Sequence, residues 1–142
     1  TASGVRNVKL HDARTEPLCE APAPFDVVVT LDVLHDAPFP ADLIAQVKRR
    51  LAPGHGVWLL ADITSQPSVR ENLKANPAAA TMWAFSTCLC MACALSEKGG
   101  AGLGTLGFSV PVARRMLGDA GFTDVSVLHE ADNTRWFQVT AS

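Results

Sequence analysis

The sequence has little charge and almost no excess of either sign. Its 12 Lys and Arg residues and 14 Asp and Glu residues give a formal net charge of −2 at pH 7, and charged residues make up 18% of the 142-residue chain. Proteins that bind nucleic acids or anionic membranes need clustered basic charge. We therefore expect neither nucleic acid nor a membrane among the partners. The sequence also has no recognisable signal peptide.

Cysteine is sparse, and three of the four cysteines lie in the run CLCMAC as Cys88, Cys90 and Cys93. A zinc site usually takes C-x-x-C pairs in turns, with further Cys or His ligands that converge. On a helix Cys90 and Cys93 share a face, whereas Cys88 points roughly 200° away from Cys90. We favour packed, reduced cysteines in a cytoplasmic protein over a metal site, and predict no bound metal.

The chain alternates apolar runs with amphipathic stretches, which predicts one α/β domain. The run Phe25–Leu31 is almost continuously apolar, as in a strand of a parallel sheet that is buried on both faces. The last two predicted strands are close together in sequence and form an antiparallel pair. The predicted strands are 8–10, 25–31, 57–61, 123–129 and 135–140, and the predicted helices flanking the sheet are 40–51 and 110–120.

The stretch Ala78–Leu95 has eighteen residues without a formal charge. Its length suits a membrane span, but several polar residues and many alanines dilute its hydropathy. Met82, Phe85 and Leu89 form a helical stripe, and a packed or lid helix needs the same stripe. We favour the lid helix.

The run G102-L-G-T-L-G107 has the G-x-G-x-x-G spacing of a dinucleotide-binding turn. That turn needs a strand before it, a helix after it and an acidic residue about twenty positions later to hold a ribose. Here the run follows a predicted helix, and no such acidic residue ends a strand. We predict that 99–107 is a flexible connection and not a phosphate site.

A stronger signal is F25-D-V-V-V-T-L-D-V-L-H-D36, in which Asp32, His35 and Asp36 follow a predicted strand. Ligands of open α/β sheets bind beyond the carboxyl ends of the strands. This stretch resembles the fourth motif of class I S-adenosylmethionine-dependent methyltransferases. The resemblance continues, in the order of that family, through V47-K-R-R-L-A-P-G54, V57-W-L-L-A-D62, L117-G-D-A-G-F-T-D-V125 and W136-F-Q-V139.

The resemblance also covers S3-G-V-R-N-V-K-L-H-D-A13, which is similar to the third strand and third motif of the family. It implies that Asp12 accepts a hydrogen bond from the adenine amino group and that Ala13 lies beside the ring. Asp32 could instead cap a turn, and His35 could be a packing residue at the start of a helix. The resemblance implies a cofactor wall of Asp12, Ala13, Leu31, Asp32 and His35, an acceptor pocket of Met82, Trp83 and Phe85, and His35 as the catalytic base.

The resemblance implies a partial Rossmann-like sheet in the family's strand order 4-5-7-6, with the last strand antiparallel. Residues 1–142 would form one truncated domain, with a helical lid and glycine-rich loop at 66–107. The glycine-rich first motif and the acid that holds the ribose have no counterpart in the sequence. We therefore expect the C-terminal part of a small-molecule methyltransferase that binds S-adenosylmethionine poorly alone. The alternative is a non-catalytic module that acts through protein contacts.

Loss of the neighbouring strand would leave an apolar sheet edge at 25–31. Open edges of this kind tend to pair with another chain. We expect a homo-oligomer, in its simplest form a two-fold dimer, whose contact includes residues 25–31 or 5–11.

Overall fold

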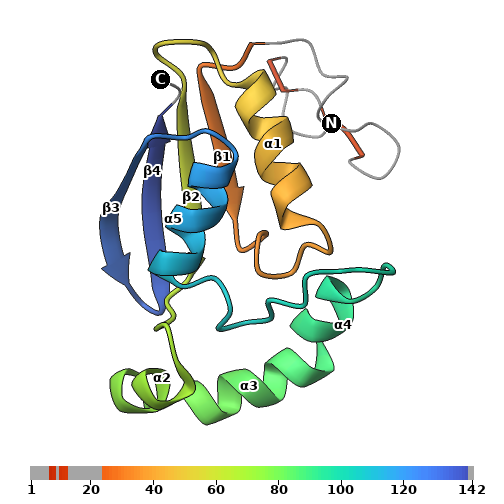
Figure 1. Ribbon diagram of the computed structural model, residues 1–142, viewed down its shortest axis with the longest axis vertical. Helices are drawn as coiled ribbons and strands as arrows, with labels where there is room; N and C mark the ends of the chain where they lie inside the picture. Colours follow the sequence, from red (N-terminus) through yellow and green to blue (C-terminus); the bar gives the residue numbers. More distant parts are fainter. Residues whose placement is uncertain (1–6, 9, 13–23, 141–142) are drawn as a thin grey trace.

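The computed structural model describes residues 7, 8, 10–12 and 24–140 (Figure 1). Its sheet consists of β1 (Val27–Leu31), β2 (Val57–Ile63), β3 (Asp124–Ala131) and β4 (Thr134–Thr140). Its helices are α1 (Pro40–Arg50), α2 (Val69–Ala75), α3 (Ala79–Cys88), α4 (Cys90–Ala94) and α5 (Val110–Asp119).

The strands form one sheet in the order β1-β2-β4-β3. β1 and β2 are parallel, whereas β4 is antiparallel to both β2 and β3. This arrangement confirms the predicted order 4-5-7-6 with an antiparallel last strand. The prediction of a strand at 8–10 is not supported, because Val8 and Leu10 have no strand geometry. Residue 9 between them lies outside the described part of the chain.

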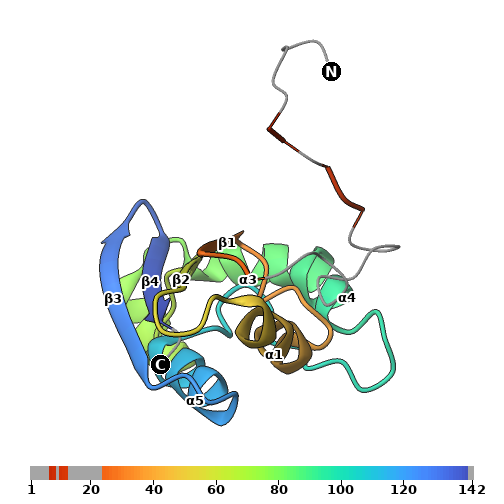
Figure 2. The ribbon, with the colours of Figure 1, turned by 90° about the horizontal axis from the view of Figure 1, so that it is seen from above.

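Helices α1 and α5 cover one face of the sheet and form the hydrophobic core with it (Figure 2). In α1 the apolar residues recur at helical spacing, and Pro40 at its start suits a helix N-terminus. Trp58 and Phe137 are the largest side chains that the sheet contributes to this core, and both are essentially inaccessible. The other fully buried core side chains include Ile44, Val47, Leu60, Ala113, Leu117 and Val139.

The opposite face of β1 is open, which corrects the prediction that this strand is buried on both faces. Val27, Val29 and Leu31 are 56%, 51% and 58% exposed, whereas Val28 packs against the core. Since side chains alternate along a strand, one face of β1 packs toward the core, whereas the three apolar side chains on its other face are each more than half exposed. The apolar sequence of β1 is typical of a strand with both faces buried, but the described residues leave one of its faces exposed.

Helices α2, α3 and α4 lie beyond the end of the sheet toward which β1 points (Figure 1). The predicted single helix 78–95 is broken at Leu89, where the backbone leaves helical geometry at φ −130° and ψ −73°. The break exposes Leu89 and turns Cys90 into the interior. No helix in the described part of the chain has the length and hydropathy needed to cross a bilayer.

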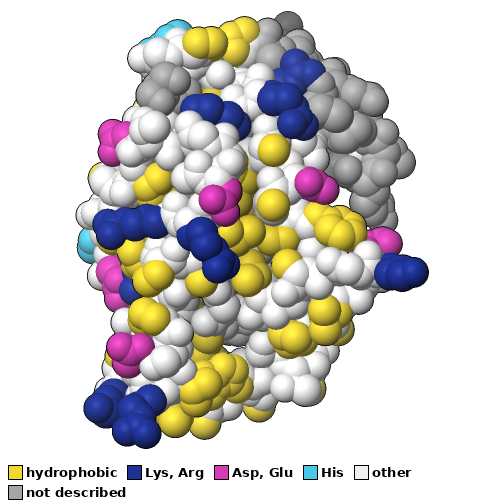
Figure 3. Space-filling model, viewed as in Figure 1, with side chains coloured by type: hydrophobic (Ala, Val, Ile, Leu, Met, Phe, Trp, Pro, Cys, Tyr) yellow, Lys and Arg dark blue, Asp and Glu magenta, His cyan; other side chains and the backbone are white. Residues whose placement is uncertain are grey.

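Hydrophobic side chains remain on the surface of this helical segment (Figure 3). Leu73, Phe85, Leu89 and Leu95 are each more than half exposed. On the same view the basic and acidic side chains are scattered among one another, and no broad region carries one sign (Figure 3). Part of the exposed apolar surface therefore lies on the segment for which a lid was predicted.

The glycine-rich loop is packed, which corrects the prediction of a flexible connection. Gly104 N–H donates to the His35 carbonyl at 3.1 Å, and Ala101 N–H donates to the Pro38 carbonyl at 2.8 Å. Gly102 and Gly104 have φ of +59° and +68°, a region that costs other residues free energy. The loop follows α4 and precedes α5, so it lacks the leading strand of a dinucleotide-binding turn.

Candidate active site

The candidate site lies where β1 and β2 end side by side. Asp32 follows β1 with φ of +55°, and its N–H donates to the Ala61 carbonyl at 3.0 Å. Aspartate is one of the few residues other than glycine that adopt this left-handed region readily. The resulting turn brings His35 to Asp62, which stands near the end of β2.

His35 and Asp62 form a buried pair and are only 2% and 1% exposed. The Nδ1 atom of His35 lies 2.7 Å from Asp62 Oδ1, and the same oxygen accepts a hydrogen bond from Ile63 N–H at 2.8 Å. The carboxylate accepts, so Nδ1 carries the proton and donates. In the neutral imidazole, Nε2 is then left with a free lone pair, as a general base requires.

The carboxylates around His35 also set its protonation. Burial by itself disfavours the imidazolium, but the hydrogen bond that His35 donates to Asp62 and the charges of Asp62, Asp36 and Asp32 outweigh it and raise the pKa of His35 above 6.5. Burial and the negative charge of Asp62 likewise raise the pKa of Asp32 above 3.8. The group of acids therefore makes His35 a stronger base than an isolated imidazole.

Cys90 and Thr105 lie on the other side of His35. Cys90 Sγ is 3.5 Å from His35 Nε2, and the Thr105 hydroxyl donates to Sγ at 2.9 Å. Burial raises the pKa of the Cys90 thiol; the Thr105 hydrogen bond opposes this shift, while Asp36 adds to it. The thiol is therefore protonated at neutral pH and is not poised as a nucleophile.

These groups meet in a cleft of about 410 Å³ between the ends of the strands and helices α3 and α4. One side is polar and contains Asp32, His35 and Asp36, whereas Met82 and Phe85 belong to its apolar side. The remaining lining residues are Ile63, Leu89, Cys90 and Thr105.

The structure thus brings together four of the residues proposed from the sequence, namely Asp32, His35, Met82 and Phe85. The others do not line this cleft. Leu31 is exposed on the open face of the sheet, and Trp83 is half-buried on α3. Asp12 is exposed in the N-terminal segment, and Ala13 lies outside the described residues.

Sequence reasoning missed Asp62, Cys90 and Thr105. Asp62 follows an apolar run, and the rule that drew attention to Asp32, namely a polar residue near the carboxyl end of a strand, applies to it equally. The sequence around Cys90 indicates only a group of neighbouring cysteines, and Thr105 lies in the loop that the sequence predicts to be flexible. Their contact with His35 depends on the helix break at Leu89 and on the folded loop.

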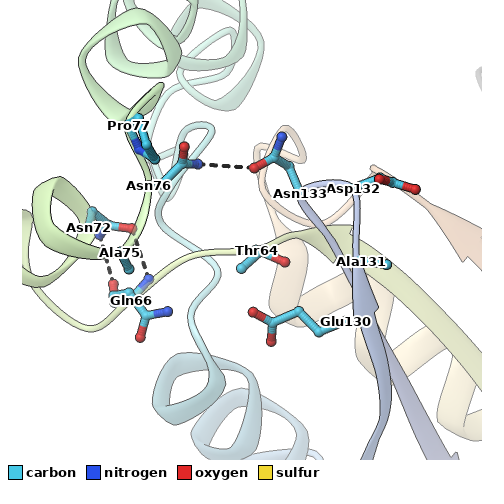
Figure 4. Close-up of a pocket in the computed structure, with 10 residues that line it drawn as sticks. All are labelled: Thr64, Gln66, Asn72, Ala75, Asn76, Pro77, Glu130, Ala131, Asp132 and Asn133. Carbon is cyan, nitrogen blue, oxygen red and sulfur yellow. Dashed lines mark hydrogen bonds between the residues drawn. The ribbon is translucent and has the colours of Figure 1, made fainter.

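A second cleft, of about 310 Å³, lies between α2 and the β3–β4 hairpin and is lined mostly by polar groups (Figure 4). Asn76 Nδ2 donates to Asn133 Oδ1 at 3.2 Å, and Asn72 exchanges two hydrogen bonds with the Gln66 backbone. These hydrogen bonds join α2 to the preceding loop and Asn76 to the hairpin (Figure 4). We interpret this region as the attachment of α2 to the hairpin.

Compared with protein-family models and with curated proteins, the chain matches none. Among solved structures it is similar to an O-methyltransferase family protein from Burkholderia thailandensis, with 20% identity and a TM-score of 0.58 over 92% of this chain and 33% of that one. It is also similar to human N-acetylserotonin methyltransferase in complex with SAM, with 18% identity and a TM-score of 0.59 over 87% and 32% of the two chains.

A third similar structure is the O-methyltransferase family 2 protein from Planctomyces limnophilus in complex with apigenin, with 19% identity and a TM-score of 0.60 over 88% of this chain and 34% of that one. The chain therefore has the fold of part of an S-adenosylmethionine-dependent methyltransferase. It spans about a third of the length of these structures.

Proposed function

We propose that the chain is the C-terminal part of an S-adenosylmethionine-dependent methyltransferase that acts on a hydroxyl group of a small molecule. The observation that carries the proposal is the buried Asp62–His35 pair, whose Nε2 faces a cleft at the carboxyl ends of the strands. The similarity to O-methyltransferase structures supports the same reaction class.

His35 acts as the general base in this proposal. Its Nε2 takes the proton of the acceptor hydroxyl, and Asp62 stabilises the imidazolium that forms, as the raised pKa of His35 indicates. S-adenosylmethionine, when bound, supplies the electrophilic methyl group. The protein otherwise orients the acceptor and excludes water from the cleft.

The acceptor has an apolar body and a hydroxyl group at one end. Met82 and Phe85 provide an apolar wall opposite the polar groups around His35. An acceptor of this shape would place its apolar part on α3 and its hydroxyl at Nε2. Phe85 is 64% exposed, so closure of the helical segment over an acceptor would bury further apolar surface.

The chain's residues fit the cofactor only in part. Asp32 and His35 stand at the end of β1, where the resemblance places the cofactor wall, and both line the cleft. The glycine-rich first motif and the ribose acid have no counterpart in this sequence. We therefore propose that S-adenosylmethionine binds well only when those elements are supplied.

Methyl transfer by the full-length gene product that contains this chain tests the proposal. His35→Gln removes the base and should lower kcat by about 10²–10⁴-fold, because general base catalysis typically contributes that much. His55→Gln is the matched control, since His55 is exposed and lies outside the cleft. Equal activity of His35→Gln and the unaltered protein would contradict the assignment.

A second candidate function is that of a non-catalytic module acting through protein contacts. The observation that favours it is the open apolar face of β1, where Val27, Val29 and Leu31 are exposed. β1 is also an edge strand among the described strands. We propose that this strand pairs with a second copy of the chain, an association that is compatible with either function.

A further inference from the structure

Three metal-binding atoms of different kinds converge at the floor of the cleft. His35 Nε2 lies 3.1 Å from Asp36 Oδ1 and 3.5 Å from Cys90 Sγ. All three atoms lie within 4.8 Å of one another. They come from the turn after β1 and from the first residue of α4, so the fold and not local sequence brings them together.

The spacing fits a tetrahedral zinc ion. Ordinary zinc bonds to nitrogen, oxygen and sulfur imply N–O and N–S separations of about 3.4 Å and about 3.5 Å around a tetrahedron. The observed separations of 3.1 Å and 3.5 Å are close to these values. A ligand set of imidazole, carboxylate and thiolate also suits zinc better than magnesium or calcium, which prefer oxygen ligands alone.

The hydrogen bonding around His35 and Asp36 also favours a metal ion at this position. Asp62 accepts the Nδ1 proton of His35, so the neutral ring has a free lone pair on Nε2, and Asp36 Oδ1 lies 3.1 Å from this atom. That oxygen is buried and makes no hydrogen bond. A cation bound by both atoms would compensate the buried carboxylate oxygen, which no hydrogen bond satisfies. A carboxylate behind a ligating imidazole is also the usual outer partner of protein-bound zinc.

We propose that His35, Asp36 and Cys90 bind one zinc ion, with a fourth position open to the cleft. Binding converts the Cys90 thiol to a thiolate, with release of its proton to solvent, while Asp36 binds as the carboxylate and His35 as the neutral imidazole. This set uses one of the three cysteines of the CLCMAC run, joined by residues distant in sequence. It differs from the cysteine cluster that the sequence analysis disfavoured.

The site would also regulate the proposed methyltransferase. A zinc ion on Nε2 occupies the lone pair that the base needs, so zinc should inhibit transfer to the acceptor. Zinc binding itself does not depend on that activity, because all three ligands belong to this chain. The two proposals can therefore fail separately.

The test is direct metal titration of the 142-residue chain. Zinc should displace a chromophoric chelator at one ion per chain, and cobalt(II) should give the near-ultraviolet charge-transfer band of a thiolate ligand. Cys90→Ser should abolish that band, and Asp36→Asn should weaken zinc binding. Asp62→Asn should weaken it by about 10–100-fold through the outer partner of His35.

Cys88→Ser and Cys93→Ser are matched controls, because both residues are exposed free cysteines next to Cys90. They should leave the cobalt band and the zinc affinity unchanged. Circular dichroism establishes whether each variant is folded. If Cys90→Ser does not fold, Asp36→Asn tests the site instead, because Asp36 is only partly buried. A chain without zinc affinity, or a cobalt band lost equally in Cys88→Ser, would overturn the proposal.

Discussion

Replacement of Gly104 by alanine should destabilise the protein far more than its place in a glycine-rich run of the sequence suggests. Gly104 has φ of +68°, and a Cβ atom there would lie 2.5 Å from Ser86 Oγ and 2.8 Å from Met91 Sδ. The methionine side chain is flexible and can move. Ser86 cannot move freely, because its hydroxyl accepts the buried Thr105 N–H at 3.0 Å.

The expected cost follows from these two effects. The left-handed backbone costs an alanine about 1–2 kcal/mol. Displacement of Ser86 leaves the Thr105 amide without its acceptor, which costs about 1–3 kcal/mol for a buried group. Alanine also lowers the conformational entropy of the unfolded chain, which stabilises the folded state by less than about 1 kcal/mol. The net loss in the free energy of unfolding should be about 2–4 kcal/mol, a large share of the stability of a small domain.

Urea unfolding of three alanine variants isolates the packing contribution. Gly99→Ala has a similar φ of +87° but no atom within 4 Å of the added Cβ, so it should lose only about 1 kcal/mol. Gly118→Ala in α5 also meets nothing within 4 Å and should gain about 0.5–1 kcal/mol. If Gly104→Ala were no less stable than Gly99→Ala, the loop would be as loose as the sequence suggested and the reasoning would fail.

Three further predictions concern the site and the open strand. The imidazole of His35, followed by NMR, should titrate above pH 6.5 because Asp62 stabilises its protonated form. The stabilisation that the protonated ring gives the folded state should be fully present below pH 6.5 and be lost as the pH rises through the folded pKa. A midpoint at or below pH 6.5 would refute this role of Asp62. The chain alone should bind S-adenosylmethionine about thirtyfold to a thousandfold more weakly than the complete domain, because a lost charge-assisted pair of hydrogen bonds costs about 2–4 kcal/mol. Micromolar binding in a calorimetric titration would contradict this. Light scattering should show a dimer, and Val29→Lys should dissociate it with little loss of stability. Val28→Lys should also lower the free energy of unfolding, because Val28 packs against the core. A 15.1 kDa monomer would exclude association through β1.

Much of the fold could be predicted because its signals are local. The apolar runs at β1 and β2 and the stripe of α1 identify these elements, and the resemblance supplied the strand order that the structure confirms. The exposure of Val29 could not be predicted in this way. Its apolar character is typical of a buried strand, but burial depends on which other segments cover that face.

The candidate site was predictable to the extent that strand ends mark it. Asp32 and His35 were found because they follow an apolar run, and Asp62 satisfies the same criterion one strand later. Cys90 reaches His35 only because the predicted helix 78–95 breaks at Leu89. No proline or glycine near Leu89 marks that break in the sequence. The contact between Cys90 and His35 therefore could not be predicted from local sequence.

All residues that we propose for the acceptor side of the active site belong to this chain, whereas the first motif and the ribose acid of the proposed cofactor side have no counterpart in it. Asp62, near the end of β2, orients His35 by accepting a hydrogen bond from its Nδ1 atom. The Gly104 N–H donates a hydrogen bond to the His35 carbonyl and so fixes the glycine-rich loop against the turn after β1. Met82 and Phe85 face these groups from α3. Methyl transfer depends on holding donor and acceptor in line, so a chain that holds only the acceptor should bind it without turnover. If the proposed function holds, acceptor binding and proton transfer to His35 should be measurable in this chain in the absence of methyl transfer.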